Sequence, residues 1–166
     1  MWFRQEVQEV PRPLKLPQVA ADTPSIEDLK AALEQLTPET RPRWGTLGAA
    51  GMLRHCSRFM ELYLGAMDVG PVLRFFTRCF GPAFLRNFMT RPLGTTPRNM
   101  RTMQPLRSDA VFDFDQERRL FLEALMSVDA LSGIVDHRLY GVMKAEDAQA
   151  LVRHHTAHHF YQFGLI

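Results

Sequence analysis

Residues 145–163 read AEDAQALVRHHTAHHFYQF, which is the pattern of a long amphipathic helix, and this stretch decides the fold. Acidic residues stand in its first turn, where they favour the helix dipole, and Gly164 follows as a terminator. The stretch also holds four of the chain's six histidines. His155 and His159 are four positions apart, so on a helix their rings lie about 40° apart and one turn along the axis. Two imidazoles at this spacing can bind one metal ion.

The four histidines of this stretch are expected to divide between the two sides of the helix. On a helical wheel, His155 and His159 lie in the middle of the apolar side. His154 points to the polar side, and His158 lies at the boundary between the two sides. The sequence therefore predicts that His155 and His159 face the core.

A third inward-facing histidine, His55, lies on the helix expected over residues 47–64. Burying an imidazole without a partner costs roughly 1–3 kcal/mol in lost hydrogen bonding. If the two helices pack together, His55, His155 and His159 can converge, and one divalent cation would satisfy all three lone pairs. Three protein ligands leave positions open for water or substrate, as in catalytic sites. The alternative is a hydrogen-bonded histidine network without a metal ion.

The rest of the chain is expected to form an extended, proline-rich leader over residues 1–22 and a single domain over residues 23–166. No segment sustains the alternation of a β-strand, and the nearest, residues 111–114, is too short to build a sheet. We therefore expect an all-α fold, a four- or five-helix bundle. Three further helices are expected. The first covers residues 24–36 and is capped by Thr23, the second covers 70–89 with a break at Gly81-Pro82, and the third runs from Asp113 or Asp115 to about Ser127. A long loop is expected over residues 90–113 and a turn over residues 133–141.

The composition excludes several classes of protein. The chain has 166 residues and a net charge of +2, which is too near neutral to require nucleic acid or a membrane as a partner. Its two cysteines form no metal-binding motif and no disulfide framework, and the N-terminus does not read as a signal peptide. We expect a cytoplasmic protein with a small-molecule partner.

Three segments of the chain resemble the DinB-like (YfiT-like) helical metalloprotein superfamily. They are LGAAGMLRH over residues 47–55, HTAHHFYQFG over residues 155–164, and the Arg-Trp-Gly entrance at residues 43–45. The last segment is similar to an uncharacterised branch that ends in His-x2-His-His-x2-Gln-Phe-Gly. The resemblance implies a four-helix bundle, here with an additional short helix or long loop and the extended leader. It also implies a divalent metal ion, often found as nickel or zinc.

Carried over position by position, the resemblance gives His55, His155 and His159 as the metal ligands. Gln162 matches a recurrent glutamine one turn beyond the last ligand and is a candidate partner that orients a ligand. His158 is the main rival of His159 as a ligand.

The resemblance also implies a type of chemistry. Characterised members of the superfamily include thiol-dependent S-transferases and an isomerase that uses low-molecular-weight thiols. A nickel, zinc or manganese ion with open positions could activate such a thiol, or water for hydrolysis. Arg98 and Arg101 could bind an anionic part of the substrate, or could simply belong to a solvated loop. The competing class is a non-catalytic bundle that binds a metal or a small ligand.

The remaining notable residues are less specific. Cys56 is expected to be a packing residue, and His137 is expected at the surface unless it lines the pocket. Phenylalanines between residues 75 and 88 could line an apolar pocket, or could form core or the face of a homodimer; they are Phe75, Phe76, Phe80, Phe84 and Phe88.

Overall fold

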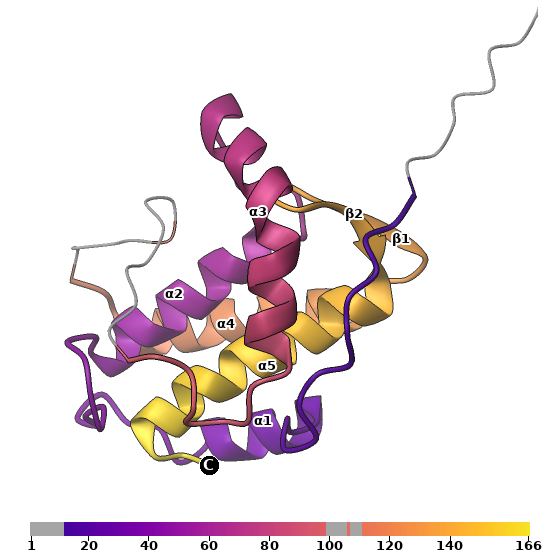
Figure 1. Ribbon diagram of the computed structural model, residues 1–166. Coiled ribbons are helices and arrows are strands. Elements are labelled where there is room, and N and C mark those ends of the chain that lie inside the picture. The colour runs from indigo at the N-terminus through magenta and orange to yellow at the C-terminus, as the bar shows by residue number, and fades with distance from the viewer. Residues whose placement is uncertain (1–11, 99–105, 107–110) are drawn as a thin grey trace, which may run out of the picture.

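The computed structural model describes residues 12–98, 106 and 111–166, and within them the chain is predominantly helical (Figure 1). The expectation of a predominantly helical fold is confirmed, and the structure adds a small two-stranded sheet that the sequence did not predict. The elements, in order, are α1 (Ile26–Leu33), α2 (Ala49–Glu61), α3 (Pro71–Met89), α4 (Phe114–Asp129), β1 (Ile134–His137), β2 (Gly141–Lys144) and α5 (Ala145–Phe163).

Side-chain caps fix where two of the helices begin. α1 begins after Ser25 rather than Thr23, because Ser25 and Asp28 form a reciprocal capping box. α4 begins after Asp113, whose carboxylate accepts the backbone N–H of Gln116. α5 has the predicted bounds and ends at Gly164, which adopts a left-handed conformation with φ of 75°.

The predicted break in the third helix does not occur. α3 continues through Gly81 and Pro82 to Met89. Pro82 is only partly buried, so water can reach the backbone carbonyl that its missing N–H leaves free. Gly81 is buried and faces the ring of Tyr140, and a Cβ at this position would overlap that ring. The glycine therefore serves close packing against the hairpin rather than a bend in the helix.

The sheet is an antiparallel hairpin that begins in the segment expected to be a turn, residues 133–141, and continues to Lys144. β1 pairs with β2 from Ile134 opposite Lys144 to His137 opposite Gly141. Val135 and His137 point inward while Ile134 and Asp136 point outward, which is the alternation of a strand. Each strand has only four residues, so the pattern was too short to be recognised in the sequence.

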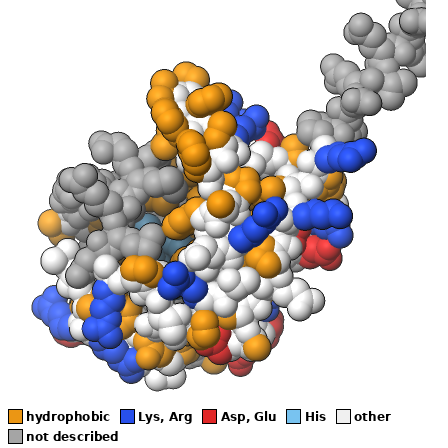
Figure 2. Space-filling model, in the orientation of Figure 1, with side chains coloured by type: hydrophobic (Ala, Val, Ile, Leu, Met, Phe, Trp, Pro, Cys, Tyr) orange, Lys and Arg blue, Asp and Glu red, His pale blue; other side chains and the backbone are white. Residues whose placement is uncertain are grey.

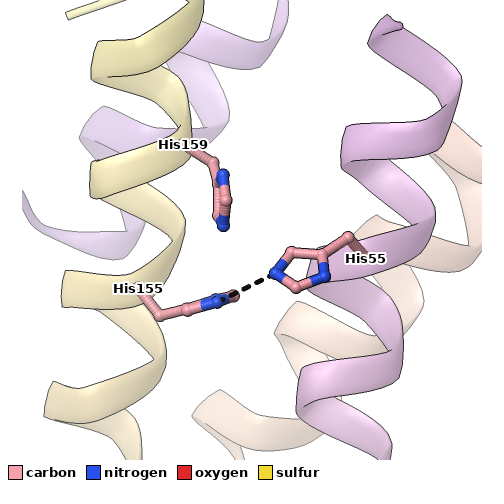
Figure 3. A group of neighbouring side chains, drawn as sticks. All are labelled: His55, His155 and His159. Carbon is pink, nitrogen blue, oxygen red and sulfur yellow. Dashed lines mark hydrogen bonds between the residues drawn. The ribbon is translucent and has the colours of Figure 1, made fainter. Parts of the chain in front are cut away.

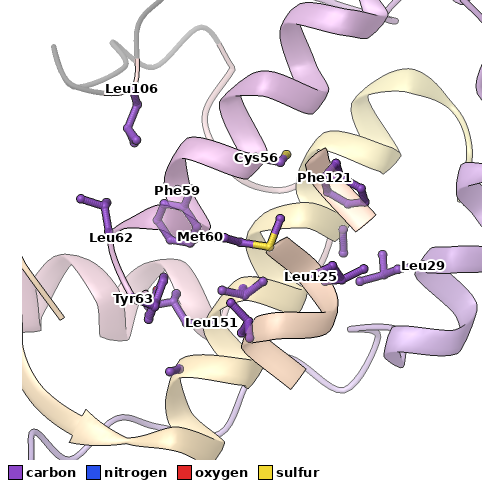
Figure 4. Close-up of a cluster of buried hydrophobic side chains, with 14 of the residues drawn as sticks. Leu29, Cys56, Phe59, Met60, Leu62, Tyr63, Leu106, Phe121, Leu125 and Leu151 are labelled. Carbon is purple, nitrogen blue, oxygen red and sulfur yellow. The ribbon is translucent and has the colours of Figure 1, made fainter. Parts of the chain in front are cut away.

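The core is shared by α1, α2, α4 and α5, with α2 and α4 in the most extensive contact (Figure 4). Leu29, Met60, Phe121, Leu125 and Leu151 are fully buried, one or two from each of these helices. Burying a side chain of this size contributes about 1.5–3 kcal/mol. This packing holds α2 against α5, the two helices that carry the predicted ligands.

The leader and the first half of α3 lie on the outside of this core, whereas Leu85, Phe88 and Met89 at the end of α3 belong to it. The described part of the leader bonds to the domain through the N–H groups of Leu14 and Ala20, which donate to the carbonyls of Val142 and Met89. Residues 1–11 of the expected leader lie outside the described residues. The first half of α3 projects beyond the other helices (Figure 1). None of the helices described combines the length and apolar character that a bilayer crossing requires.

Candidate metal centre

His55, His155 and His159 converge between α2 and α5 (Figure 3). His55 projects from the middle of α2, and the other two project from successive turns of α5. Nε2 of His55 lies 3.2 Å from Nε2 of His155. The ring centroids of His55 and His159 are 4.7 Å apart, and those of His155 and His159 are 4.8 Å apart. The structure thus brings together the three residues that the sequence singled out.

The spacing of the three rings suits a single metal ion. One nitrogen from each histidine lies within 4.8 Å of the others. A tetrahedral ion with metal–nitrogen bonds of about 2.0–2.1 Å holds its ligand nitrogens roughly 3.3 Å apart. The 3.2 Å contact between His55 and His155 already matches this value. Small ring rotations would bring the nitrogen of His159 to the same separation.

Gln162 fixes the orientation and the tautomer of His159. The side-chain amide of Gln162 donates to the carbonyl of Trp44 over 2.7 Å, which identifies its other atom as the oxygen. That oxygen lies 2.9 Å from Nδ1 of His159, so Nδ1 must carry the proton and donate. Nε2 of His159 is then a free lone pair directed towards the other two rings.

The other two histidines are held by different means. Nδ1 of His55 lies 3.4 Å from the carbonyl of Leu106, and donation there leaves Nε2 as a lone pair. The ring of His155 stacks on Phe59 with centroids 3.9 Å apart. Nδ1 of His155 is buried and has no hydrogen-bond partner among the described residues. One proton between His55 and His155 can satisfy that pair, but no donor among the described residues bonds to Nε2 of His159. A cation would satisfy all three.

Burial keeps the three imidazoles neutral. The pKa of His155 and the pKa of His159 lie well below the ordinary value, first because of burial and second because neighbouring histidines disfavour a further positive charge. The pKa of His55 is also lowered by burial, opposed in part by its contact with the Leu106 carbonyl. Neutral rings are the form that binds a metal ion, so the site needs no deprotonation at neutral pH.

Aromatic side chains wall the site without closing it. The Phe88 ring lies against His154, His155 and His158, with centroid distances of 4.9, 6.4 and 6.3 Å. His155 and His159 remain partly exposed. Histidine surface is visible beside the base of α3 in Figure 2. The described residues therefore leave part of the cluster exposed.

The remaining predicted site residues lie around the cluster rather than in it. His158 is next to His159, with ring centroids 5.0 Å apart, and turns an edge towards Trp44. The guanidinium of Arg98 lies 4.8 Å above the Trp44 ring. Arg101 lies outside the described residues. Cys56 is buried, and burial raises the pKa of its thiol. Both properties agree with a packing role.

Two histidines are not where the sequence placed them. His154, expected on the polar side of α5, is buried and its Nδ1 lies 2.8 Å from the hydroxyl of Thr23. Thr23, directly after the leader, and Phe88 of α3 cover that side of α5, which a helical wheel cannot reveal. His137, expected at the surface, is buried on β1, where its Nδ1 accepts the backbone N–H groups of Leu139 and Tyr140.

Some residues of the site had no recognised role in the sequence. The Trp44 carbonyl positions Gln162, and the backbone N–H of Arg43 donates to the Gln162 carbonyl over 2.7 Å. The Arg-Trp-Gly motif at residues 43–45 was the available signal in the sequence for this segment, but the motif did not indicate that the segment contacts Gln162. Phe59 follows His55 by one helical turn and shares its inward face, and Phe88 was among the phenylalanines that could line a pocket. The structure adds that both rings lie beside His155.

The chemical capacity of the arrangement follows from its donor set. Three neutral nitrogen ligands suit nickel, zinc or another first-row divalent ion. Three ligands also leave coordination positions free, unlike a closed structural site. The centre could therefore hold an ion that a thiol, water or an anion can reach.

Comparison with known proteins places the chain in a family. No curated protein and no solved structure shows significant similarity to it. One family model matches residues 16–164, which include the three converging histidines, Gln162 and the Trp44 segment. Since this match covers most of the chain, the protein belongs to the family described as "Protein of unknown function (DUF1569)".

Proposed function

We propose that the protein is a metal-dependent enzyme in which His55, His155 and His159 hold one divalent ion that activates a low-molecular-weight thiol or a water molecule. The observation that carries the proposal is the convergence of three neutral, oriented imidazoles at a partly exposed position. A four-helix bundle of the DinB-like type, resembled in the sequence, is part of the same proposal. The ion, when bound, supplies a Lewis acid that lowers the pKa of a thiol or water.

The residues of the chain have separate tasks in this proposal. Gln162 holds His159 in the tautomer that offers Nε2. Phe59 and Phe88 form apolar walls beside His155, which limit the access of bulk water. Arg98, held over Trp44 at the exposed edge, is the described arginine that we propose to contact an anionic part of the substrate. Low-molecular-weight thiols are abundant in a reducing cytoplasm, where we propose that the protein acts.

The test measures whether a small thiol reaches the ion and reacts there. The protein is loaded with cobalt or nickel, and 2-mercaptoethanol is added while the thiolate-to-metal absorption is followed in the near ultraviolet. Transfer of the thiol to monochlorobimane is then measured: the sulfur bonds to carbon, chloride leaves and the thiol proton passes to solvent. We expect both signals in the wild type and in the control Arg119→Lys, which changes an exposed arginine of α4, and neither in His155→Ala.

The competing function is a bundle that binds a metal ion without catalysis. It predicts that the ion binds with the same stoichiometry but that added thiol changes neither the absorption nor the rate of transfer. The partial exposure of His155 and His159 favours the enzyme, because a purely structural ion is normally enclosed by four protein ligands.

A further inference from the structure

Helix α3 is apolar on two opposite sides, although only one of them packs against other parts of the chain that the structure describes. The inner side is buried through Gly81, Leu85 and Phe88. The outer side carries Val72, Phe75, Phe76 and Phe80, whose exposed fractions are 69%, 65%, 54% and 69%. A helix that is apolar around most of its circumference is normally covered on both sides. Among the described residues, the outer side therefore lacks the cover that its composition requires.

The exposed residues form one continuous stripe along the projecting half of α3. Relative to Val72, the phenylalanines stand at the third, fourth and eighth following positions and Cys79 at the seventh, which is the spacing of one helical face. We call this set, with the exposed Cys79, the outer stripe: Val72, Phe75, Phe76, Cys79 and Phe80. In Figure 2 it forms the apolar projection above the body of the molecule.

The shape of the outer stripe suits another copy of itself. Cys79 is small and lies on the midline, with Phe75 and Phe76 one turn before it and Phe80 beside it. Large side chains around a small one provide both a ridge and a groove, which is the basis of helix–helix packing. We propose that two copies of this chain form a homodimer in which the outer stripes pack antiparallel around a twofold axis near Cys79.

The area of the stripe agrees with this partner. With the exposed fractions given above, its apolar surface is on the order of 500 Å², at the upper end of what monomers expose. A stable interface buries about 800 Å² on each partner, with an apolar centre and a polar rim. The outer stripe supplies the centre. Phe84, 46% exposed on the next turn, extends it.

The charges beside the stripe favour a second copy over a lipid surface. Arg74 and Arg78 flank the phenylalanines, but each already lies 3.8 Å from a carboxylate of its own chain, Asp68 and Asp136 respectively. Neutralised arginines can meet their counterparts across a twofold axis without strong repulsion. A membrane-binding helix instead needs unpaired basic side chains to attract anionic headgroups.

Cys79 provides a direct test of the geometry. Cys56 is 1% exposed and the pKa of its thiol is raised, so Cys79 is the reactive thiol of the described chain. A short bis-maleimide should convert most of the wild type into a covalent dimer under native conditions. Cys79→Ser should give none.

The oligomeric state is measured on the same protein by sedimentation velocity across a range of concentrations. Phe80→Glu places a charge in the proposed contact and should raise the dimer dissociation constant about 30-fold or more, as loss of a central interface residue does. The matched control is Met126→Glu, because Met126 is 60% exposed on α4 and lies outside the stripe. Circular dichroism and thermal unfolding establish that both variants fold.

Three results would overturn the proposal. The first is a wild type that stays monomeric at high concentration. The second is a dimer that neither cross-links through Cys79 nor weakens in Phe80→Glu, which would place the interface elsewhere. The third is a monomer that binds phosphatidylglycerol-containing vesicles and loses this binding in Phe80→Glu, which would assign the stripe to membranes. A dimer that cross-links at Cys79 and dissociates in Phe80→Glu, but not in Met126→Glu, supports it.

Discussion

The side-chain oxygen of Gln162 lies 2.9 Å from Nδ1 of His159, one turn back on the same helix. Because the amide nitrogen of Gln162 is committed to the Trp44 carbonyl, the contact can be made in only one sense, with the histidine donating. The lone pair of His159 is thereby directed to the cluster before any ion binds.

Replacement of this glutamine should weaken metal binding. In Gln162→Leu, Nδ1 of His159 loses its acceptor and the ring is no longer held in one tautomer. Loss of such a partner typically costs 10–100-fold in metal affinity, which we expect here, measured by competition with a chelator. The control is Gln149→Leu, since Gln149 also lies on α5 but bonds to the Asp129 carbonyl, away from the cluster. Equal affinities in the two variants would contradict this role.

Two glycine-to-alanine substitutions should have opposite effects. Gly81 faces the buried Tyr140 ring, so Gly81→Ala forces the ring or α3 to shift and should lower the free energy of unfolding by about 1–3 kcal/mol.

Gly51 lies inside α2 with only an ordinary contact to Leu47, at 3.6 Å from an added Cβ. Gly51→Ala should therefore stabilise the protein by about 0.5–1 kcal/mol through helix propensity. Urea unfolding at neutral pH measures both. A stabilising Gly81→Ala would contradict the packing described.

Acid should destabilise the protein partly through His137. Burial lowers the pKa of His137 to about 3 in the folded state, whereas an unfolded histidine titrates near 6.5. Between these values the unfolded chain binds the additional proton, so stability is full above pH 6.5 and falls as the pH decreases towards 3. This group alone should contribute a slope of about 1.4 kcal/mol per pH unit.

The contribution of His137 to this pH dependence is isolated by comparing the wild type with His137→Asn. The side-chain oxygen of the asparagine can still accept the N–H of Leu139. Urea unfolding between pH 4 and 7 should show a shallower pH dependence for His137→Asn than for the wild type. The other buried histidines contribute equally to both proteins and cancel in the difference. Identical slopes would mean that His137 is protonated in the folded protein.

The sequence was sufficient to predict the bounds and the inward-facing residues of a helix that packs on one side and ends at a clear terminator. α5 has the predicted bounds, and His155 and His159 face His55 as their four-residue spacing indicated. Cys56 is buried, as expected of a packing residue. These features depend on local spacing, which a single sequence contains.

The sequence was insufficient to predict burial and helix continuity where contacts with segments distant in the sequence determine them. His154 is buried because Thr23, directly after the leader, and Phe88 of α3 cover a second side of α5. α3 passes through Pro82 unbroken because Gly81 packs on Tyr140 of the hairpin, nearly 60 residues away in sequence. The hairpin itself has four residues in each strand, which is too short for a period of two to be distinguished from a turn.

The most direct test of the central claim is the metal content of untagged protein, measured by mass spectrometry after incubation with nickel, zinc or manganese and removal of unbound ions. We expect about one divalent ion per chain in the wild type and in His158→Ala. We expect none in His55→Ala, His155→Ala or His159→Ala, with folding checked by circular dichroism. A wild type that retains no ion, or an ion that is lost only in His158→Ala, would contradict the three-histidine centre.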